Sequence, residues 1–105
     1  MTLDEYQEAA IATAVYPRNE NSALLYTALG LASEAGEYAG KVKKLIRDAE
    51  WSRCAACAEL GDVLWYVAAA ARELGFTLDE VARANIDKLT DRKERNRLHG
   101  SGDYR

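Results

Sequence analysis

The chain has 105 residues, of which 49% are hydrophobic and 30% charged, with one proline and a net charge of -3 at pH 7. This composition fits one ordered domain over residues 1–105 and excludes a disordered or fibrous chain. The acidic balance argues against a nucleic-acid polymer as partner, because phosphate affinity needs Lys and Arg clustered over a face. No stretch reaches the roughly 20 uninterrupted apolar residues of a membrane span, and the acidic start is unlike a signal peptide, so we expect a cytoplasmic protein.

The first predicted helix covers residues 3–14. Thr2 and Glu5 form a capping-box pattern at its start, and apolar residues follow at rough helical spacing. The pair Tyr16-Pro17 ends it, because the residue before a proline is disfavoured in helical conformation. A polar turn over residues 18–21 then leads to the next helix.

The second and third predicted helices cover residues 23–46 and 53–74. Lys and Arg side chains close the second helix, where cations suit the C-terminal end of a helix dipole. The third has an apolar middle over residues 63–71, which indicates burial on more than one face. Because only a short break separates the two helices, we expect them to pack as an antiparallel hairpin.

The fourth predicted helix begins after Gly75, a residue suited to the left-handed conformation that ends many helices. Thr77 and Glu80 form its capping box, and it continues to about Asn96. The tail, residues 97–105, is turn-like and is either loose or folded against a bound ligand. No alternating strand pattern occurs, so the fold class is all-α with four helices.

Two acidic pairs, Glu34–Glu37 and Glu59–Asp62, lie at the same i, i+3 spacing inside the second and third predicted helices. Each pair points to one side of its helix, where like charges repel and buried carboxylates lose solvation. In a tight hairpin Glu37 and Glu59 are offset by roughly 9 Å along the axis, a gap that a slightly different turn closes. Facing helical carboxylates build metal sites, and oxygen-only ligands favour Mg²⁺ or Mn²⁺. The alternative is two solvated acidic faces.

Asn85, Lys88 and Arg92 follow at spacings of three and four on the fourth predicted helix, so an amide, an ammonium and a guanidinium share one face. Magnesium is usually bound by carboxylates together with substrate phosphates, which favours phosphoryl or pyrophosphoryl chemistry with water as nucleophile. We expect the three side chains to contact the phosphates. The alternative is an exposed charged face.

The chain resembles the MazG-like branch of the all-α nucleoside triphosphate pyrophosphohydrolases over about residues 24–105. Four motifs carry this resemblance: Leu29–Glu37, Glu59–Tyr66, Asn85–Leu89 with Arg92, and His99–Asp103. The resemblance implies a four-helix bundle that assembles into a homodimer or homotetramer. It also implies hydrolysis of a nucleoside triphosphate, deoxy or noncanonical ones included, to a monophosphate and pyrophosphate. The implied Mg²⁺ ligands are Glu34, Glu37, Glu59 and Asp62, and the implied phosphate contacts are Asn85, Lys88 and Arg92.

One position departs from the family pattern, because Ser33 stands where the first of two adjacent glutamates is expected. Glu34 or Glu37 would then serve as the base, with Glu59 as a further catalytic carboxylate. Trp65 and Tyr66 either stack a base or belong to the core, the latter being commoner for aromatic residues on an apolar helix. Two rival functions remain: the same fold acting on phosphoribosyl-ATP or a nucleotide-diphosphate conjugate, and a non-catalytic helical oligomer that binds nucleotide or metal.

Overall fold

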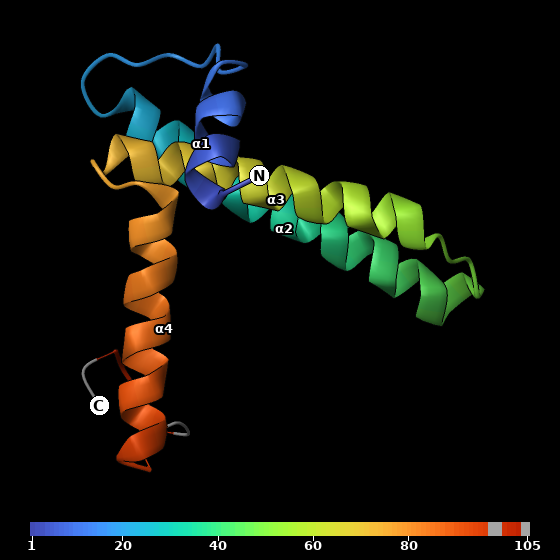
Figure 1. The fold of residues 1–105 in the computed structure, drawn as a ribbon. Coiled ribbons are helices and arrows are strands. Elements are labelled where there is room, and N and C mark those ends of the chain that lie inside the picture. Colours follow the sequence, from blue (N-terminus) through green and yellow to red (C-terminus); the bar gives the residue numbers. More distant parts are fainter. Residues whose placement is uncertain (97–99, 104–105) are drawn as a thin grey trace.

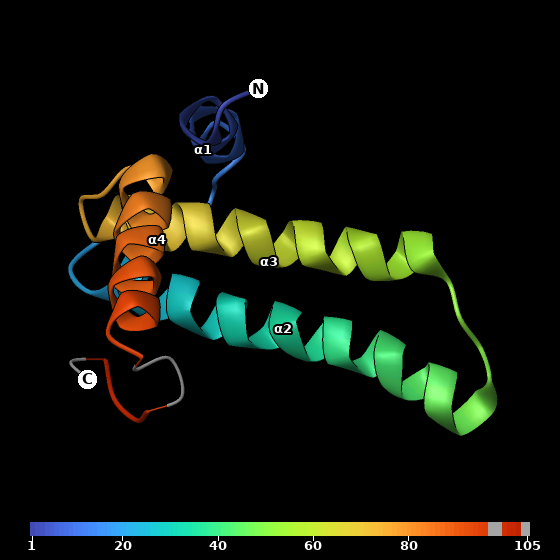
Figure 2. The ribbon, with the colours of Figure 1, turned by 60° about the horizontal axis from the view of Figure 1, so that its bottom comes forward.

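The computed structural model describes residues 1–96 and 100–103, and over these residues the protein is all-helical. Its helices are α1 (Leu3–Ile11), α2 (Ser22–Asp48), α3 (Arg53–Glu73) and α4 (Leu78–Glu94). The long helices α2 and α3 lie side by side and run antiparallel, as predicted, and α1 lies against α3 (Figures 1 and 2). The hairpin of α2 and α3 is therefore the frame on which the rest of the chain is placed.

Helix α1 begins as predicted but ends three residues earlier than the predicted residue 14. The Thr2 hydroxyl accepts a hydrogen bond from the Glu5 amide at 3.1 Å and so caps the first turn. At the other end the Thr13 amide and hydroxyl both donate to the Ala10 carbonyl, at 3.0 and 2.6 Å. This tightened turn replaces the next helical hydrogen bond, and the chain leaves the helix axis.

The junction between α3 and α4 follows the predicted pattern. Gly75 has a φ of 85°, in the left-handed region, and the Phe76 amide donates to the Ala71 carbonyl at 2.9 Å. This is the glycine-terminated end of a helix, which reverses the chain direction within two residues. Thr77 and Glu80 then form a complete capping box that starts α4.

The core is small and built mostly from alanines of α3. Ala68 and Ala69 are fully buried, and Trp65 packs against both of the buried clusters that they belong to. Gln7 of α1 donates to the Ala68 carbonyl at 3.1 Å and accepts from the Leu78 amide at 3.0 Å. These bonds join α1, α3 and the first turn of α4 at one end of the hairpin.

By length and composition alone, α3 is long and apolar enough to cross a membrane. In this fold it instead contacts the three other helices. Its middle also carries Glu59 and Asp62, which a bilayer would accept only at a high free-energy cost. Only 22% of its most apolar stretch is buried within this chain, so packing against the other helices accounts for part of its apolar character.

Helix α4 leaves the junction at a steep angle and projects away from the hairpin (Figure 1). It contacts α1 and α3, and no residue of α4 contacts α2. The predicted four helices are therefore present, but a single chain does not close them into a bundle. Of the tail, residues 100–103 lie beside α4, where Lys88 contacts Asp103, and residues 97–99 and 104–105 lie outside the described residues.

Candidate active site

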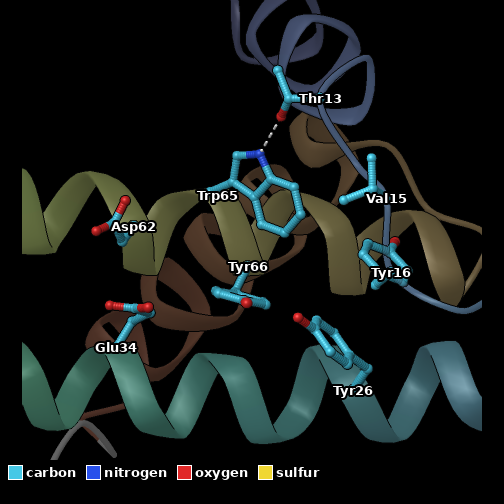
Figure 3. A pocket seen from close by; sticks show the side chains of 8 residues that line it. All are labelled: Thr13, Val15, Tyr16, Tyr26, Glu34, Asp62, Trp65 and Tyr66. Carbon is cyan, nitrogen blue, oxygen red and sulfur yellow. Dashed lines mark hydrogen bonds between the residues drawn. The ribbon is translucent and has the colours of Figure 1, made fainter.

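Three carboxylates meet across the hairpin near its middle. Glu34 of α2 faces Glu59 and Asp62 of α3, and one oxygen of each lies within 4.8 Å of the others. Figure 3 shows Glu34 reaching from α2 toward α3, where Asp62 lies opposite it. Glu34 and Glu59 are half-buried, whereas Asp62 is exposed. The structure thus brings together three of the four predicted metal ligands.

A close contact one turn away sets the spacing of the two helices at this point. Gly30 lies under the ring of Tyr66, and a Cβ at Gly30 would come within 2.1 Å of the Tyr66 ring. Glu34 follows Gly30 by four residues on α2, and Asp62 precedes Tyr66 by four residues on α3. Because the helices are antiparallel, the next turn after the Gly30–Tyr66 contact places these two carboxylates opposite each other.

The electrostatics of the cluster favour a bound cation. Burial raises the pKa of the Glu34 carboxyl, and the negative charges of Asp62, Glu59 and Glu37 raise it further. Lys41 offsets part of this charge, with its Nζ 3.8 Å from Glu59 Oε1. Oxygens bound to one Mg²⁺ lie at most about 4.2 Å apart, so small side-chain movements suffice to bring the three into one coordination shell. The donor set therefore fits a divalent metal.

Glu37 and Ser33 flank this cluster on α2, and both are exposed. The Glu37 carboxylate lies outside the group of three, although its charge acts on Glu34. Ser33 offers a hydroxyl where the family pattern has a carboxylate. The fourth predicted ligand is therefore adjacent to the cluster and not within it.

A pocket of about 370 Å³ opens beside the carboxylates (Figure 3). Its walls are aromatic: the rings of Tyr16 and Tyr26 stack at 5.4 Å, and Trp65 meets Tyr66 edge to face at 4.9 Å. The lining residues come from the segment between α1 and α2, from α2 and from α3: Thr13, Val15, Tyr16, Tyr26, Glu34, Asp62, Trp65 and Tyr66. The site therefore combines acidic groups with flat apolar surfaces.

Trp65 belongs mainly to the core. Its indole Nε1 donates to Thr13 Oγ1 at 2.9 Å and to the Ala10 carbonyl at 3.2 Å, which ties α3 to the end of α1. Tyr66 is more directly at the site, since the charges of Glu34 and Asp62 contribute to its raised pKa after burial and the hydroxyl of Tyr26. The core interpretation holds for Trp65, while Tyr66 lies at the pocket.

Sequence reasoning missed the pocket wall formed by Thr13, Val15, Tyr16 and Tyr26. Thr13, Tyr16 and Tyr26 reach the site through contacts with residues of α3 some 40 to 57 positions away in the chain, which no local pattern reveals. One signal was present in Tyr16, an aromatic residue directly before Pro17 at the entrance to a polar turn. Large aromatic residues in such places are usually buried against another element.

The predicted phosphate-binding residues lie apart from the carboxylates, on the projecting α4. Lys88 and Arg92 both pair with the Asp103 carboxylate, at 3.3 and 3.5 Å, and Arg92 also donates to the Asp103 carbonyl. Hydrogen bonding from Lys88 and then from Arg92 lowers the pKa of Asp103. Arg92 is 3% exposed, so the chain already satisfies its charge. Asn85 and Lys88 line a second pocket, of about 690 Å³, at the corner of α3 and α4.

Comparison with known proteins decides the family. The model of the MazG nucleotide pyrophosphohydrolase domain matches residues 23–96. This chain belongs to that family. The MazG match covers α2, α3 and α4, and so includes both acidic pairs and the three polar residues of α4. Membership indicates nucleotide pyrophosphohydrolase activity.

The chain is also similar to the Gene 37 protein of Mycobacterium phage L5, with 45% identity over 114 aligned positions that cover all of both chains. That similarity extends beyond the MazG match to α1 and to the tail. No solved structure matches the chain. The name of the phage protein states no activity, so the chemistry has to be argued from the site.

Proposed function

We propose that this protein is a cytoplasmic, Mg²⁺-dependent hydrolase that converts a nucleoside triphosphate and water to a nucleoside monophosphate and pyrophosphate. Mn²⁺ would serve in place of Mg²⁺. The observation that carries the proposal is the group of Glu34, Glu59 and Asp62, which face one another across the hairpin at the edge of an aromatic pocket. Membership of the MazG family supports the same reaction class.

The carboxylates would have two roles, metal binding and proton transfer. Glu59 and Asp62 of α3, with Glu34 and Glu37 of α2, would hold the metal, which supplies charge neutralisation on the phosphates and lowers the pKa of bound water. Of the two glutamates of α2, Glu34 is the better placed base, because Glu37 lies outside the group of three that faces across the hairpin and Glu34 lies within it. The water proton passes to this carboxylate as the oxygen bonds to phosphorus, and the α–β bridging oxygen leaves with pyrophosphate.

The aromatic pocket would receive the nucleoside. It adjoins the carboxylates, so a triphosphate held there has its base and sugar within reach of the rings. The volume of about 370 Å³ lies in the range of small-molecule sites. Tyr26 is 45% exposed and offers ring surface for stacking, an interaction open to every base.

The site would be completed in a homodimer or homotetramer. The i, i+4 pair Leu25 and Leu29 on α2 is 63% and 71% exposed, and Leu60 and Leu64 on α3 are 50% and 39% exposed. Such apolar pairs on a short chain favour burial against a second copy. A partner's α4 would then supply its phosphate-contacting residues, Asn85, Lys88 and Arg92, to the carboxylates.

A nucleotide panel tests the proposal. Pyrophosphate release is measured with ribonucleoside and deoxyribonucleoside triphosphates, noncanonical ones included, and with phosphoribosyl-ATP and a nucleotide-diphosphate conjugate, in Mg²⁺ or Mn²⁺. We expect turnover of at least one nucleoside triphosphate by the wild-type protein. In Glu59→Gln the turnover should fall by about 100-fold or more, because mutating even a residue that only hydrogen-bonds to a metal ligand typically lowers activity about 10- to 100-fold.

Glu8→Gln, the same change at an exposed position of α1, is the matched control and should keep full activity. Turnover of the conjugate or of phosphoribosyl-ATP alone would change the assigned substrate and leave the proposed active site unchanged. Metal-dependent nucleotide binding without any turnover would instead show a binding protein and overturn the hydrolase proposal.

A further inference from the structure

The carboxylate of Glu73, in the last turn of α3, holds the segment that leads from α1 to α2. Its side chain is only 10% exposed. The Tyr16 hydroxyl donates to Glu73 Oε2 at 2.6 Å, the Arg18 guanidinium donates to Oε1 at 3.3 Å, and Arg72 donates to Oε2 at 3.0 Å. Burial alone would raise the pKa of Glu73, but these three donors together lower it, so the carboxylate is ionised at neutral pH.

Tyr16 transmits this attachment to the pocket. Its ring is 8% exposed, stacks on Tyr26 and meets Trp65 edge to face at 6.1 Å. Arg72 donates to the Tyr16 hydroxyl at 2.6 Å, and its guanidinium lies 5.7 Å from the ring centre. The hydroxyl is therefore fixed on one side by Glu73 and Arg72, while the ring lines the pocket on the other.

The segment before Tyr16 forms the rest of this wall, through Thr13 and Val15. Val15 is 96% exposed, so few contacts of its own hold it in place. Because Tyr16 and Arg18 both bind Glu73, the backbone between α1 and α2 is attached to α3 on each side of Pro17. Without this attachment the Tyr16 hydroxyl would keep its bond from Arg72, and the wall would otherwise be held by the Thr13–Trp65 bond and the packing of the Tyr16 ring.

We infer that Glu73 is a positioning residue for nucleoside recognition, which acts through Tyr16 to fix the aromatic wall of the pocket. The inference rests on the proposed function, since it assigns the pocket to the nucleoside. Glu73 lies eleven residues beyond Asp62, roughly 16 Å along α3. Its loss should therefore weaken binding of the nucleoside and leave the binding of phosphate and metal at the carboxylates intact.

The test compares two ligands on the full chain by calorimetry in Mg²⁺: inorganic pyrophosphate, and the monophosphate of the nucleotide that the wild-type protein hydrolyses fastest. If no nucleotide is hydrolysed, a panel of monophosphates is used. The variants are Glu73→Gln, Tyr16→Phe and the double variant. We expect each to weaken monophosphate binding about tenfold, with pyrophosphate binding changed less than twofold, because each change weakens or removes the bond from the Tyr16 hydroxyl to a charged acceptor.

The double variant should lose little more than either single one, because both changes break the same interaction. Asp48→Asn is the matched control, since it removes a carboxylate from an exposed ion pair at the far end of the hairpin and should change neither affinity. Tyr16→Phe keeps the packed ring, so it tests the idea even if Glu73→Gln folds poorly.

Unchanged monophosphate binding in both single variants, or an equal loss of pyrophosphate binding, would overturn the inference. If the wild-type protein hydrolyses a triphosphate while the variants bind its monophosphate normally, only the role of Glu73 fails. If it neither hydrolyses a triphosphate nor binds any monophosphate, the proposed function fails as well.

Discussion

The middle of the hairpin and the projecting α4 carry the two halves of one predicted site in opposite states. In the hairpin, like charges are held together: Glu34, Glu59 and Asp62 lie within 4.8 Å, and the pKa of Glu34 is raised. On α4, opposite charges are already paired, with Lys88 and Arg92 on Asp103. The first region has an excess of charge that a ligand can relieve, while the second is satisfied within the chain.

This difference shows which part of the site a single chain completes. The hairpin holds its carboxylates through contacts between neighbouring helices, and metal or substrate is the remaining requirement. Helix α4 contacts α3 and α1 but not α2. In the proposed function, the phosphate-contacting residues of α4 therefore reach the carboxylates of a second copy. Variants of the hairpin, of α4 and of the tail test this difference between the two regions.

The largest expected effect comes from placing a carboxylate variant of the hairpin and a variant of α4 on different chains. Glu59→Gln and Lys88→Ala proteins should each retain about 1% of wild-type turnover or less. If sites form across a dimer interface, mixing equal amounts should restore about a quarter of it, because half of the dimers are mixed and each has one complete site of two. The measurement is pyrophosphate release after subunit exchange.

Mixing Glu59→Gln with Asp62→Asn is the matched control, because both changes affect the same carboxylate group and no pairing restores it. This mixture should remain at the level of the single variants. If the first mixture also stays there, α4 acts within its own chain or takes no part.

Metal addition should stabilise the hairpin and leave α4 unaffected. Because the folded pKa of Glu34 is raised, the metal-free protein loses stability as pH rises from the ordinary carboxyl pKa of 4.5 through the raised folded pKa, and this stability is absent above it. Mg²⁺ at 100 times its Kd should add about 2.7 kcal/mol to the free energy of unfolding. Thermal unfolding at pH 7 checks this, and an equal shift in Glu59→Gln would contradict a site at the carboxylates.

Gly30→Ala should destabilise the hairpin by about 1–3 kcal/mol, because the new methyl group overlaps the Tyr66 ring. Gly36→Ala on the same helix has open space at its Cβ and should be neutral or stabilising by up to about 1 kcal/mol. Denaturant unfolding of both variants measures the difference. Equal stabilities would show that the two helices are not held at this spacing.

Asp103→Asn should have the smallest effect, since Asp103 is 74% exposed and exposed ion pairs contribute little. Its folded pKa is lowered, so its contribution is present above the ordinary pKa of 3.8 and is lost as pH falls below that value. The melting temperature of Asp103→Asn should therefore differ from wild type by no more than a few degrees at pH 7, and by less at pH 3. A large loss at pH 7 would show that the tail is essential to α4.

The sequence predicts those parts of the fold that depend on near neighbours. The hairpin helices were predicted at residues 23–46 and 53–74 and occur at Ser22–Asp48 and Arg53–Glu73, because caps, glycines and apolar spacing are local signals. Antiparallel arithmetic across a short turn predicted that the two acidic pairs would lie near each other, but it took Glu37 and Glu59 as the facing residues, whereas Glu34 is the residue of α2 that meets Glu59 and Asp62. The direction of α4 and the wall around Tyr16 could not be predicted, since each depends on contacts between distant segments.

The contact between Gly30 and Tyr66 also bears on how this sequence can change over evolutionary time. A mutation that enlarges residue 30 meets the ring, while one that shrinks residue 66 leaves a void against the glycine backbone. Either change alone destabilises the contact, and the other change compensates for it. The two positions should therefore be substituted together among descendants of this chain. A lineage that carries alanine or serine at 30 is expected to carry a side chain smaller than tyrosine at 66.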